Sequence, residues 1–396
     1  MPLIIYYLSG FMAFLAGHTL NYSAIMYSLD VFDSSLISGI AFSFCFGTSL
    51  IFGWFAGAAI DRYSAKRVLL LSQNLHILGA IGFWLVLQQQ GSLSGNLYAL
   101  LAACFVTGIG WSFIAPARMT QMAQYLPVER LPQGAIIYNL LLMIGFGLAP
   151  VLITQLRAAL DWANVIEVCL GLLIVSSMLM LNAPNQFKKK PHQHLLKEWQ
   201  ECFQQLQIHK ASAQFLLSAL VCLIIVGPMQ VILPIIASQH LQLAPSQVGQ
   251  YMGLIALGLI IGGIAAMKLK NKVHVGYFIL LALFTCSLGM MLIGQLFNLY
   301  SNSLLLLLTI IIAGIASSFI VAGIQQQTPA AIKGRVMSMY TITSQSMPAM
   351  SGALAGALSH QYGPSNSLLI MGCLMLTATL LLIVKSPQLR AFHRFS

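Results

Sequence analysis

The chain has 396 residues, of which 58% are hydrophobic and only 7% are Asp, Glu, Lys or Arg, and its formal net charge is +11. Soluble domains carry about 25% charged residues, so this composition excludes an ordinary water-facing protein. The positive charge does not indicate a nucleic-acid partner, because the basic residues lie in short gaps between apolar runs. No nucleotide-binding loop, metal-ligand spacing or catalytic set occurs, so we expect no cofactor, no metal and no enzyme activity.

Apolar runs recur along the whole chain and are continuous, which indicates helices rather than the alternating strands of a membrane barrel. A run of about 20 apolar residues spans a bilayer as a helix. The predicted spans are 4–28, 36–60, 67–89, 95–117, 132–155, 162–182, 213–238, 246–268, 273–296, 303–325, 334–358 and 365–384. The sequence therefore predicts an all-α membrane protein with 12 transmembrane helices. Its six-helix halves, 1–182 and 213–396, would be related by pseudo-two-fold symmetry and joined by a linker, 183–212.

The basic residues favour one orientation of these spans. With a cytoplasmic N-terminus, 18 of the 19 Lys and Arg residues fall on the cytoplasmic side, and only Arg157 falls outside. Cytoplasmic loops of membrane proteins carry an excess of Lys and Arg. A missed or extra helix would move every later loop to the wrong side, so this asymmetry predicts both the helix number and two cytoplasmic termini.

The linker has a pattern of its own. Three lysines, 188–190, precede apolar residues that share one helical face. This pattern predicts an amphipathic helix on the cytoplasmic headgroups, with its lysines facing anionic lipid. The alternative is a segment that only joins the two halves. The apolar residues of the face are Leu195, Leu196, Trp199, Phe203 and Leu206.

Two similar segments indicate an internal duplication. Pro116-Ala-Arg118 and the loop 126–132 precede the fifth span, and Pro329 with Lys333-Gly334-Arg335 precedes the eleventh. Each is followed by a helix that Gly and Pro interrupt, at 145–150 and 348–356. Interrupted helices in corresponding places of two halves are typical of the moving elements of transporters. Plain helix packing is the alternative for each glycine alone.

The loop after the second span, 53–67, places Gly57 before Asp61-Arg62 and a Lys66-Arg67 pair. This pattern resembles the cytoplasmic signature of the major facilitator superfamily, although Ser64 stands where the family has a second glycine. The resemblance implies the twelve-helix fold and transport by alternating access. It also implies a conformational gate, which would comprise Gly57, Asp61, Arg62, Lys66, Arg67, Arg118, Lys333, Gly334 and Arg335; lipid binding is the alternative role for Arg118.

Ala115-Pro-Ala-Arg118, the loop 126–132 and the segment 333–336 resemble the branch of this superfamily that contains enterobactin exporters and macrolide-efflux proteins. Two departures stand out. The second half has no acid in 267–272 to match Asp61, and Pro150 is followed by Val151 rather than by the small pair usual in antiporters. The resemblance implies a bacterial inner-membrane location.

Ionisable residues within the spans are costly in lipid, so each is a functional candidate. Glu167 and His18 are the proton-coupling candidates, and a structural role at headgroup level is the alternative for Glu167. We interpret His76 as a packing residue. Polar contacts to a substrate in a central cavity are assigned to Asn21, Tyr22, Tyr138, Asn139, Gln230, Gln325 and Gln345.

With so little charge inside the membrane, the expected cargo is an amphiphilic or mostly neutral organic molecule. The sequence thus predicts a proton-coupled exporter, an antiporter of siderophore-like or drug-like molecules. An importer of the same fold is the alternative, and a sensor is the hypothesis from another class. The expected partners are a small-molecule substrate, protons and membrane lipid, with no nucleic acid, and the chain is expected to be a monomer.

Overall fold

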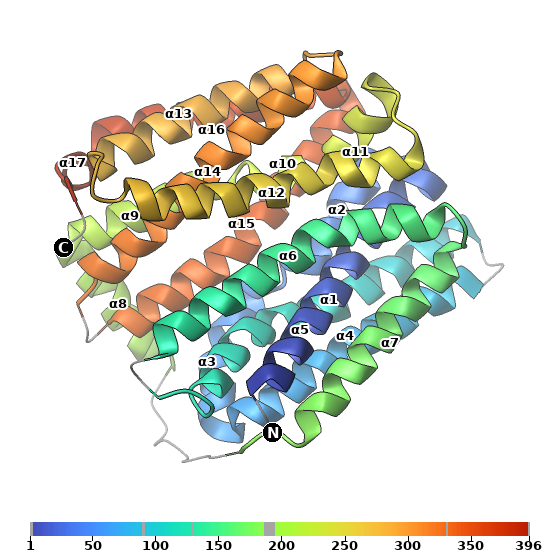
Figure 1. Cartoon of the computed structure of the whole chain (residues 1–396), viewed down its shortest axis with the longest axis horizontal. Coiled ribbons are helices and arrows are strands. Elements are labelled where there is room, and N and C mark those ends of the chain that lie inside the picture. Colours follow the sequence, from blue (N-terminus) through green and yellow to red (C-terminus); the bar gives the residue numbers. More distant parts are fainter. Residues whose placement is uncertain (1–2, 89–91, 128–129, 186–194, 330–331, 395–396) are drawn as a thin grey trace. The chain divides into compact units, whose positions relative to one another are not determined.

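A computed structural model describes residues 3–88, 92–127, 130–185, 195–329 and 332–394 (Figure 1). All regular structure in these ranges is helical. The prediction of an all-α protein is confirmed for the part of the chain that the structure describes.

Six spans of the N-terminal part follow the predicted order (Figure 1). The second predicted span is built from two helices, α2 and α3, which the residues around Gly47 separate; together they cover 35–63. Several helices run beyond the predicted ends, because a helix continues through polar residues where hydropathy falls. The helices are α1 (Leu3–Phe32), α2 (Ser35–Phe46), α3 (Ser49–Tyr63), α4 (Ala65–Gln88), α5 (Leu93–Met122), α6 (Leu131–Arg157) and α7 (Trp162–Leu181).

The C-terminal part begins with the linker helix α8 (Leu195–Ile208). The next span, 210–240, is interrupted and changes to a π-helical turn at its end. Pro228 and Pro234 lie in its short central helices, and each removes a backbone donor from the helical ladder. The elements are α9 (Lys210–Leu223), α10 (Val226–Val231), α11 (Leu233–Ile235), η2 (Ile236–His240), α12 (Pro245–Leu269), α13 (Val275–Ile293), α14 (Leu299–Gln327), α15 (Lys333–Tyr362), α16 (Pro364–Lys385) and α17 (Pro387–Arg390).

Eleven segments within the described ranges are long and apolar enough to cross a membrane. The remaining long helix, α15, has 30 residues but a more polar composition, with Ser, Thr and Gln along its first half. Its length of about 45 Å, at 1.5 Å per residue, exceeds the hydrocarbon thickness. With α15, the described chain has the twelve membrane-length segments that the sequence predicts.

The chain divides into two compact units, which we call the first unit (1–191 with 243–256) and the second unit (192–242 with 257–396). The start of α12 therefore groups with the N-terminal helices, whereas the predicted division placed all of α12 in the C-terminal half. Small residues account for this grouping. A Cβ atom on Gly147 of α6 would collide with Ala256, and one on Gly249 of α12 would collide with Thr154. Glycine at these two positions lets α6 and the start of α12 approach closely.

Candidate functional site

A buried polar network connects four helices of the first unit. Ser9 of α1 and Ser176 of α7 exchange hydrogen bonds, and the Ser176 hydroxyl donates to the Ser9 carbonyl at 2.7 Å. Gln73 of α4 donates to Ser176 Oγ at 2.6 Å. All three side chains are fully buried. Hydrogen bonds of this kind satisfy polar groups where no water reaches them, so they fix these helices together.

Arg118 of α5 completes the network. Its Nη2 donates to the carbonyl and the hydroxyl of Ser9, both at 3.2 Å, and its guanidinium lies 5.8 Å from the ring centres of Tyr6 and Phe14. The side chain is fully buried. The helix α5 runs four residues past Arg118, so this residue is inside the helix rather than at the end predicted from hydropathy.

The charge of Arg118 has little compensation. Its Nε and Nη1 atoms are buried and have no hydrogen-bond partner among the described residues, and no carboxylate there forms an ion pair with it. Tyr6 and Tyr138 lie close enough to interact electrostatically with the Arg118 guanidinium. An unpaired buried cation is expensive, and such groups concentrate where a protein binds a ligand or moves a charge.

His18 of α1 lies in an aromatic cluster of the same unit. Its ring centre is 4.8 Å from that of Trp111, 5.2 Å from that of Phe146 and 6.4 Å from that of Phe46. Phe14 links this cluster to Tyr138, at 5.1 Å between ring centres, and therefore to the rings around Arg118. Both nitrogens of His18 are buried without a partner among the described residues.

The structure thus brings together several of the predicted site residues. Asn21 is fully buried with both amide atoms unpartnered, and the Tyr138 hydroxyl is buried and unpartnered as well. Tyr22 packs against Phe146, at 5.7 Å between ring centres. We define the buried polar site as Arg118, His18, Asn21, Tyr22 and Tyr138 with their surrounding rings. It combines aromatic surface with polar atoms that have no partner in the described chain, a combination suited to an amphiphilic ligand.

The other predicted contact residues have different surroundings within their own units, and their contact with cargo stays a prediction. Asn139 follows Tyr138 on α6 but is exposed, together with the neighbouring Leu140. Gln325 is exposed on α14. Gln230 is buried on α10 with its Oε1 atom unpartnered, and Gln345 is half-buried on α15, both within the second unit.

The second proton-coupling candidate, Glu167, has a different environment from His18. It lies on an exposed face of α7, where Oε1 accepts from Trp84 Nε1 at 3.0 Å and Oε2 accepts from Asn164 at 3.2 Å. His76, interpreted as a packing residue, is buried and pairs with the Ser72 carbonyl at 2.8 Å.

The predicted gate segment forms the turn between α3 and α4. Lys66 donates to the carbonyl of Leu181 at the end of α7, and Arg62 stacks over Tyr63 at 5.2 Å. Asp61 is half-buried, Arg67 is exposed, and a Cβ atom on Gly57 would meet nothing within 4 Å. Close helix approach at Gly57 is therefore not seen within the described chain.

Ser64 stands at the turn itself with φ 87° and ψ 149°. This conformation is one that essentially only glycine adopts without strain. The Ser64 hydroxyl accepts weakly from the Arg67 backbone N–H at 3.4 Å. The turn is thus as tight as a glycine would make it, and serine at this position strains the backbone.

The matching segment of the second unit begins α15. Lys333 and Arg335 are half-buried and Gly334 is exposed with open space around it. The Gly334 carbonyl accepts from Ser338 within the helix at 3.0 Å.

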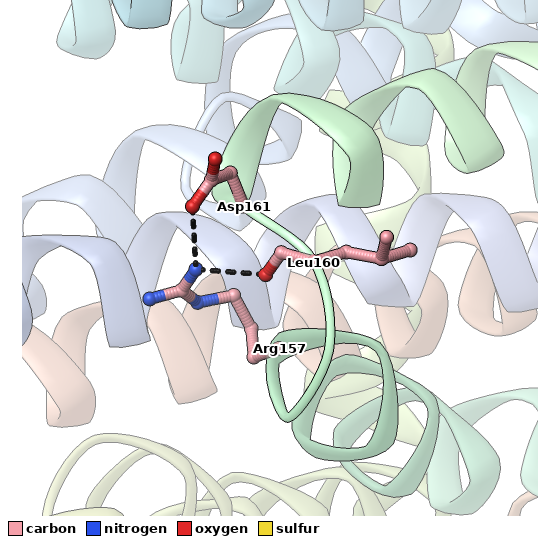
Figure 2. A network of polar contacts seen from close by, with 3 residues as sticks. All are labelled: Arg157, Leu160 and Asp161. Atoms are coloured by element: carbon pink, nitrogen blue, oxygen red, sulfur yellow. Dashed lines mark hydrogen bonds and ion pairs between the residues drawn. The ribbon is translucent and has the colours of Figure 1, made fainter.

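Arg157, the one basic residue predicted on the outer side of the membrane, forms an ion pair with a nearby acid. Its Nη1 atom lies 3.9 Å from Asp161 Oδ1 and donates to the Leu160 carbonyl at 3.0 Å. Figure 2 shows both contacts as dashed lines. Its guanidinium also lies over Trp162 at 4.8 Å. The acid in the short loop between α6 and α7 offsets this charge, so the outlier in the basic pattern is locally paired.

Sequence reasoning did not identify Ser9, Gln73 and Ser176, because Ser and Gln are ordinary residues of apolar helices. It also did not identify Trp111, whose ring lies between those of His18 and Phe14. The available signal was the position of Ser9 and Gln73 within apolar runs, where a polar side chain needs a partner.

The profile of the Major Facilitator Superfamily matches residues 3–353. The enterobactin exporter EntS of Escherichia coli O1:K1 / APEC is 27% identical over 364 residues, which cover 88% of this chain and 83% of the exporter. The corresponding exporter of Escherichia coli O139:H28 (strain E24377A / ETEC) is 26% identical over the same extent.

Solved transporters share the fold at low identity. A POT family transporter crystallised with 5-aminolevulinic acid has a TM-score of 0.77 and 13% identity, over 97% of this chain and 96% of that one. The nucleoside transporter NupG has a TM-score of 0.76 and 14% identity, over 96% and 98%. A D-xylose–proton symporter has a TM-score of 0.75 and 14% identity, over 98% of each chain.

Proposed function

The chain belongs to the Major Facilitator Superfamily and is a multi-pass membrane transporter rather than an enzyme, and from this premise we propose that it exports siderophore-like or drug-like organic molecules in exchange for protons, by alternating access. The observation that carries the proposal is the match to enterobactin exporters, which extends over 88% of this chain. A match of this extent favours export over the other transport modes found on this fold.

The buried polar site supports a cargo of this class. Its aromatic rings offer apolar contact area, while His18, Asn21 and Tyr138 offer hydrogen bonds that the described chain leaves unused. Arg118 adds a positive charge, so a cargo with an acidic or electron-rich polar group suits the site better than a cationic one. This extends the expectation of a mostly neutral cargo to weakly acidic molecules.

The distribution of acids limits how protons can be coupled. None of the eight Asp and Glu residues lies beyond Glu201, so the second unit offers no carboxylate in any of its spans. A buried proton carrier is therefore sought in the first unit, because His240 and His360, the described histidines within the second unit's membrane-length segments, are not fully buried. We propose His18 in this role, since it lies in the buried polar site, and retain Glu167 as the competing candidate.

Transport in proteoliposomes tests both parts of the proposal. The purified full chain is reconstituted, a panel of siderophores and hydrophobic drugs is offered, and cargo and proton fluxes are measured with and without an imposed pH gradient. We expect cargo to move against the proton gradient and protons to move with each cargo molecule. Equal cargo movement in the absence of a pH gradient and a membrane potential would contradict proton coupling.

Direction is tested separately in cells. A strain that lacks this gene should accumulate the cargo internally, and complementation should restore its release. Accumulation outside the deletion strain would instead support the importer. We further propose an inner-membrane location with both termini in the cytoplasm, which follows from the distribution of the basic residues and is checked by labelling cysteines introduced into the loops.

A further inference from the structure

A groove of about 540 Å³ lies on the second unit, along α13. Its walls are apolar side chains of α13 together with Ile383 of α16. Tyr277 and Leu281 on this wall are 58% and 62% exposed, and they are one helical turn apart. The volume is within the range of about 300–1,000 Å³ typical of ligand-binding pockets. The walls suit a hydrocarbon chain, because they offer little besides apolar surface.

One end of the groove carries a cation. Arg390 of α17 lines it, and the Nε atom of this arginine is buried without a hydrogen-bond partner among the described residues. No Asp or Glu follows Glu201 in the sequence, and no carboxylate among the described side chains forms an ion pair with Arg390. An anion would therefore complete the hydrogen bonding of this arginine.

The position of Arg390 is fixed by the backbone around it. The N–H groups of Val275 and Gly276, at the start of α13, donate to the carbonyls of His393 and Phe392 at 3.0 and 2.9 Å. Gly276 permits this contact, because a Cβ atom there would collide with the Leu389 carbonyl. The C-terminal segment is therefore held against the start of α13, and Arg390 is placed at the groove rather than left free to move.

The charged residues nearest to this end in sequence are basic. Lys270 and Lys272 precede the groove residue Val273, and Lys385 and Arg394 flank α17 in sequence. His274 also lines the groove, but partial burial and the neighbouring His393 lower its pKa, so at neutral pH the charge comes from Arg390 and the lysines. Anionic headgroups gather at basic pockets between transmembrane helices.

We propose that this groove binds an anionic phospholipid, with the lipid phosphate at Arg390 and an acyl chain along Tyr277, Leu281 and Ile383. Charge complementarity selects the anion, and the apolar walls select a lipid over a free phosphate, which would use only the basic end. The site is independent of the proposed transport function, since it involves none of the residues of the buried polar site.

The test measures lipid affinity of the purified full chain in a neutral detergent, from the rise in thermal midpoint with lipid concentration. The probes are dioleoyl phosphatidylglycerol, dioleoyl phosphatidylcholine and inorganic phosphate. We expect phosphatidylglycerol to bind more tightly than phosphatidylcholine, and inorganic phosphate to have no effect. The Arg390→Gln variant should bind phosphatidylglycerol about fivefold more weakly or worse, whereas Arg394→Gln should stay close to wild type.

A second pair of variants addresses the acyl chain. Leu281→Trp fills the groove and should weaken phosphatidylglycerol binding even where Arg390→Gln fails to fold, whereas Leu288→Trp, on the same helix and outside the groove lining, should not. The proposal is overturned if both lipids bind equally, if inorganic phosphate reproduces the effect, or if each variant and its control behave alike.

Discussion

The two units distribute their polar groups in opposite ways. The first unit buries a cation, two histidines and a network of Ser and Gln side chains among its helices. The spans of the second unit carry no carboxylate, and its helices approach one another through small residues. Gly227 of α10, for example, meets Pro348 and Ser351 of α15 so closely that a Cβ atom would collide with both. Both units thus use close packing at glycine, and the first unit adds buried ionisable groups to it.

This difference suggests a division of labour between the halves of a transporter. Buried polar groups are retained at a cost in stability, so they are expected where cargo or protons are handled. Interrupted, small-residue helices change conformation with little side-chain rearrangement, so they are expected where movement occurs. Substitutions in each unit test whether chemistry and movement separate in this way.

The largest effect is expected from Arg118→Met. The substitution removes the only buried guanidinium of the polar site, so transport should fall about 10- to 100-fold. Stability should be unchanged or higher by about 1–4 kcal/mol, because an uncompensated charge is replaced by a side chain of similar size. Ser176 still donates to the Ser9 carbonyl in this variant. Unchanged transport with a lower thermal midpoint would make Arg118 a structural residue and weaken the comparison.

The two proton-coupling candidates are separated by His18→Asn and Glu167→Gln. His18→Asn should abolish the pH-gradient dependence of transport while leaving downhill cargo exchange measurable, because asparagine keeps hydrogen bonding but does not titrate. Glu167→Gln should keep coupling, since the amide can still accept from Trp84. Proton flux per cargo molecule is the measurement, and the reverse result would assign coupling to α7.

Close packing in the second unit is tested by Gly227→Ala. The added methyl group meets backbone atoms of α15, so we expect a loss of about 1–3 kcal/mol in stability, measured as a lower thermal midpoint. Gly334→Ala is the matched control in the same unit, because it meets nothing within 4 Å. It should be neutral or slightly stabilising. Equal effects of the two substitutions on the thermal midpoint would show that the close contact between Gly227 and α15 does not limit stability.

The smallest effect concerns one backbone conformation that both units use. Ser64 has φ 87° and ψ 149°, and Gly363, between α15 and α16, has φ 83° and ψ 162°. Ser64→Gly should stabilise by about 1 kcal/mol, because relief of strain exceeds the added freedom of the unfolded chain. Gly363→Ser should destabilise by a similar amount. Ser64→Ala keeps the strain but lacks the Oγ atom, so it separates the two contributions to the thermal midpoint.

Hydropathy together with the distribution of basic residues was sufficient for the number and order of the membrane segments, because the bilayer sets the requirement for about 20 apolar residues and the side on which the basic loops lie. It was insufficient for helix ends, and Arg118 shows the reason. The apolar run ends before this residue, yet α5 continues to Met122, where Gln121 donates to the Pro184 carbonyl at 2.8 Å. Tertiary partners outside the run keep the polar end of the helix ordered.

The sequence also did not predict which side of each helix faces the protein interior. Tyr138 and Asn139 were both predicted to contact cargo, yet successive residues of a helix point about 100° apart, and Tyr138 is buried whereas Asn139 is exposed. Which of the two contacts cargo stays a prediction. A helix that is apolar all round gives no sign of which side faces the protein. The lysines 188–190 and the face residue Trp199 lie outside the described side chains, so the headgroup-binding role of the linker stays a prediction, although α8 is a helix.

The Ser9–Ser176–Gln73 network has a mechanical consequence. Bonds that no water can replace are broken only together, so α1, α4 and α7 resist sliding past one another. If the transporter alternates between two states, these three helices would move as one rigid body. Bending would then occur in helices that glycine and proline interrupt, such as α10 and α11. We therefore expect slow amide hydrogen exchange along α1 and α7 and faster exchange in α10 and α11, since exchange reports local opening of the backbone.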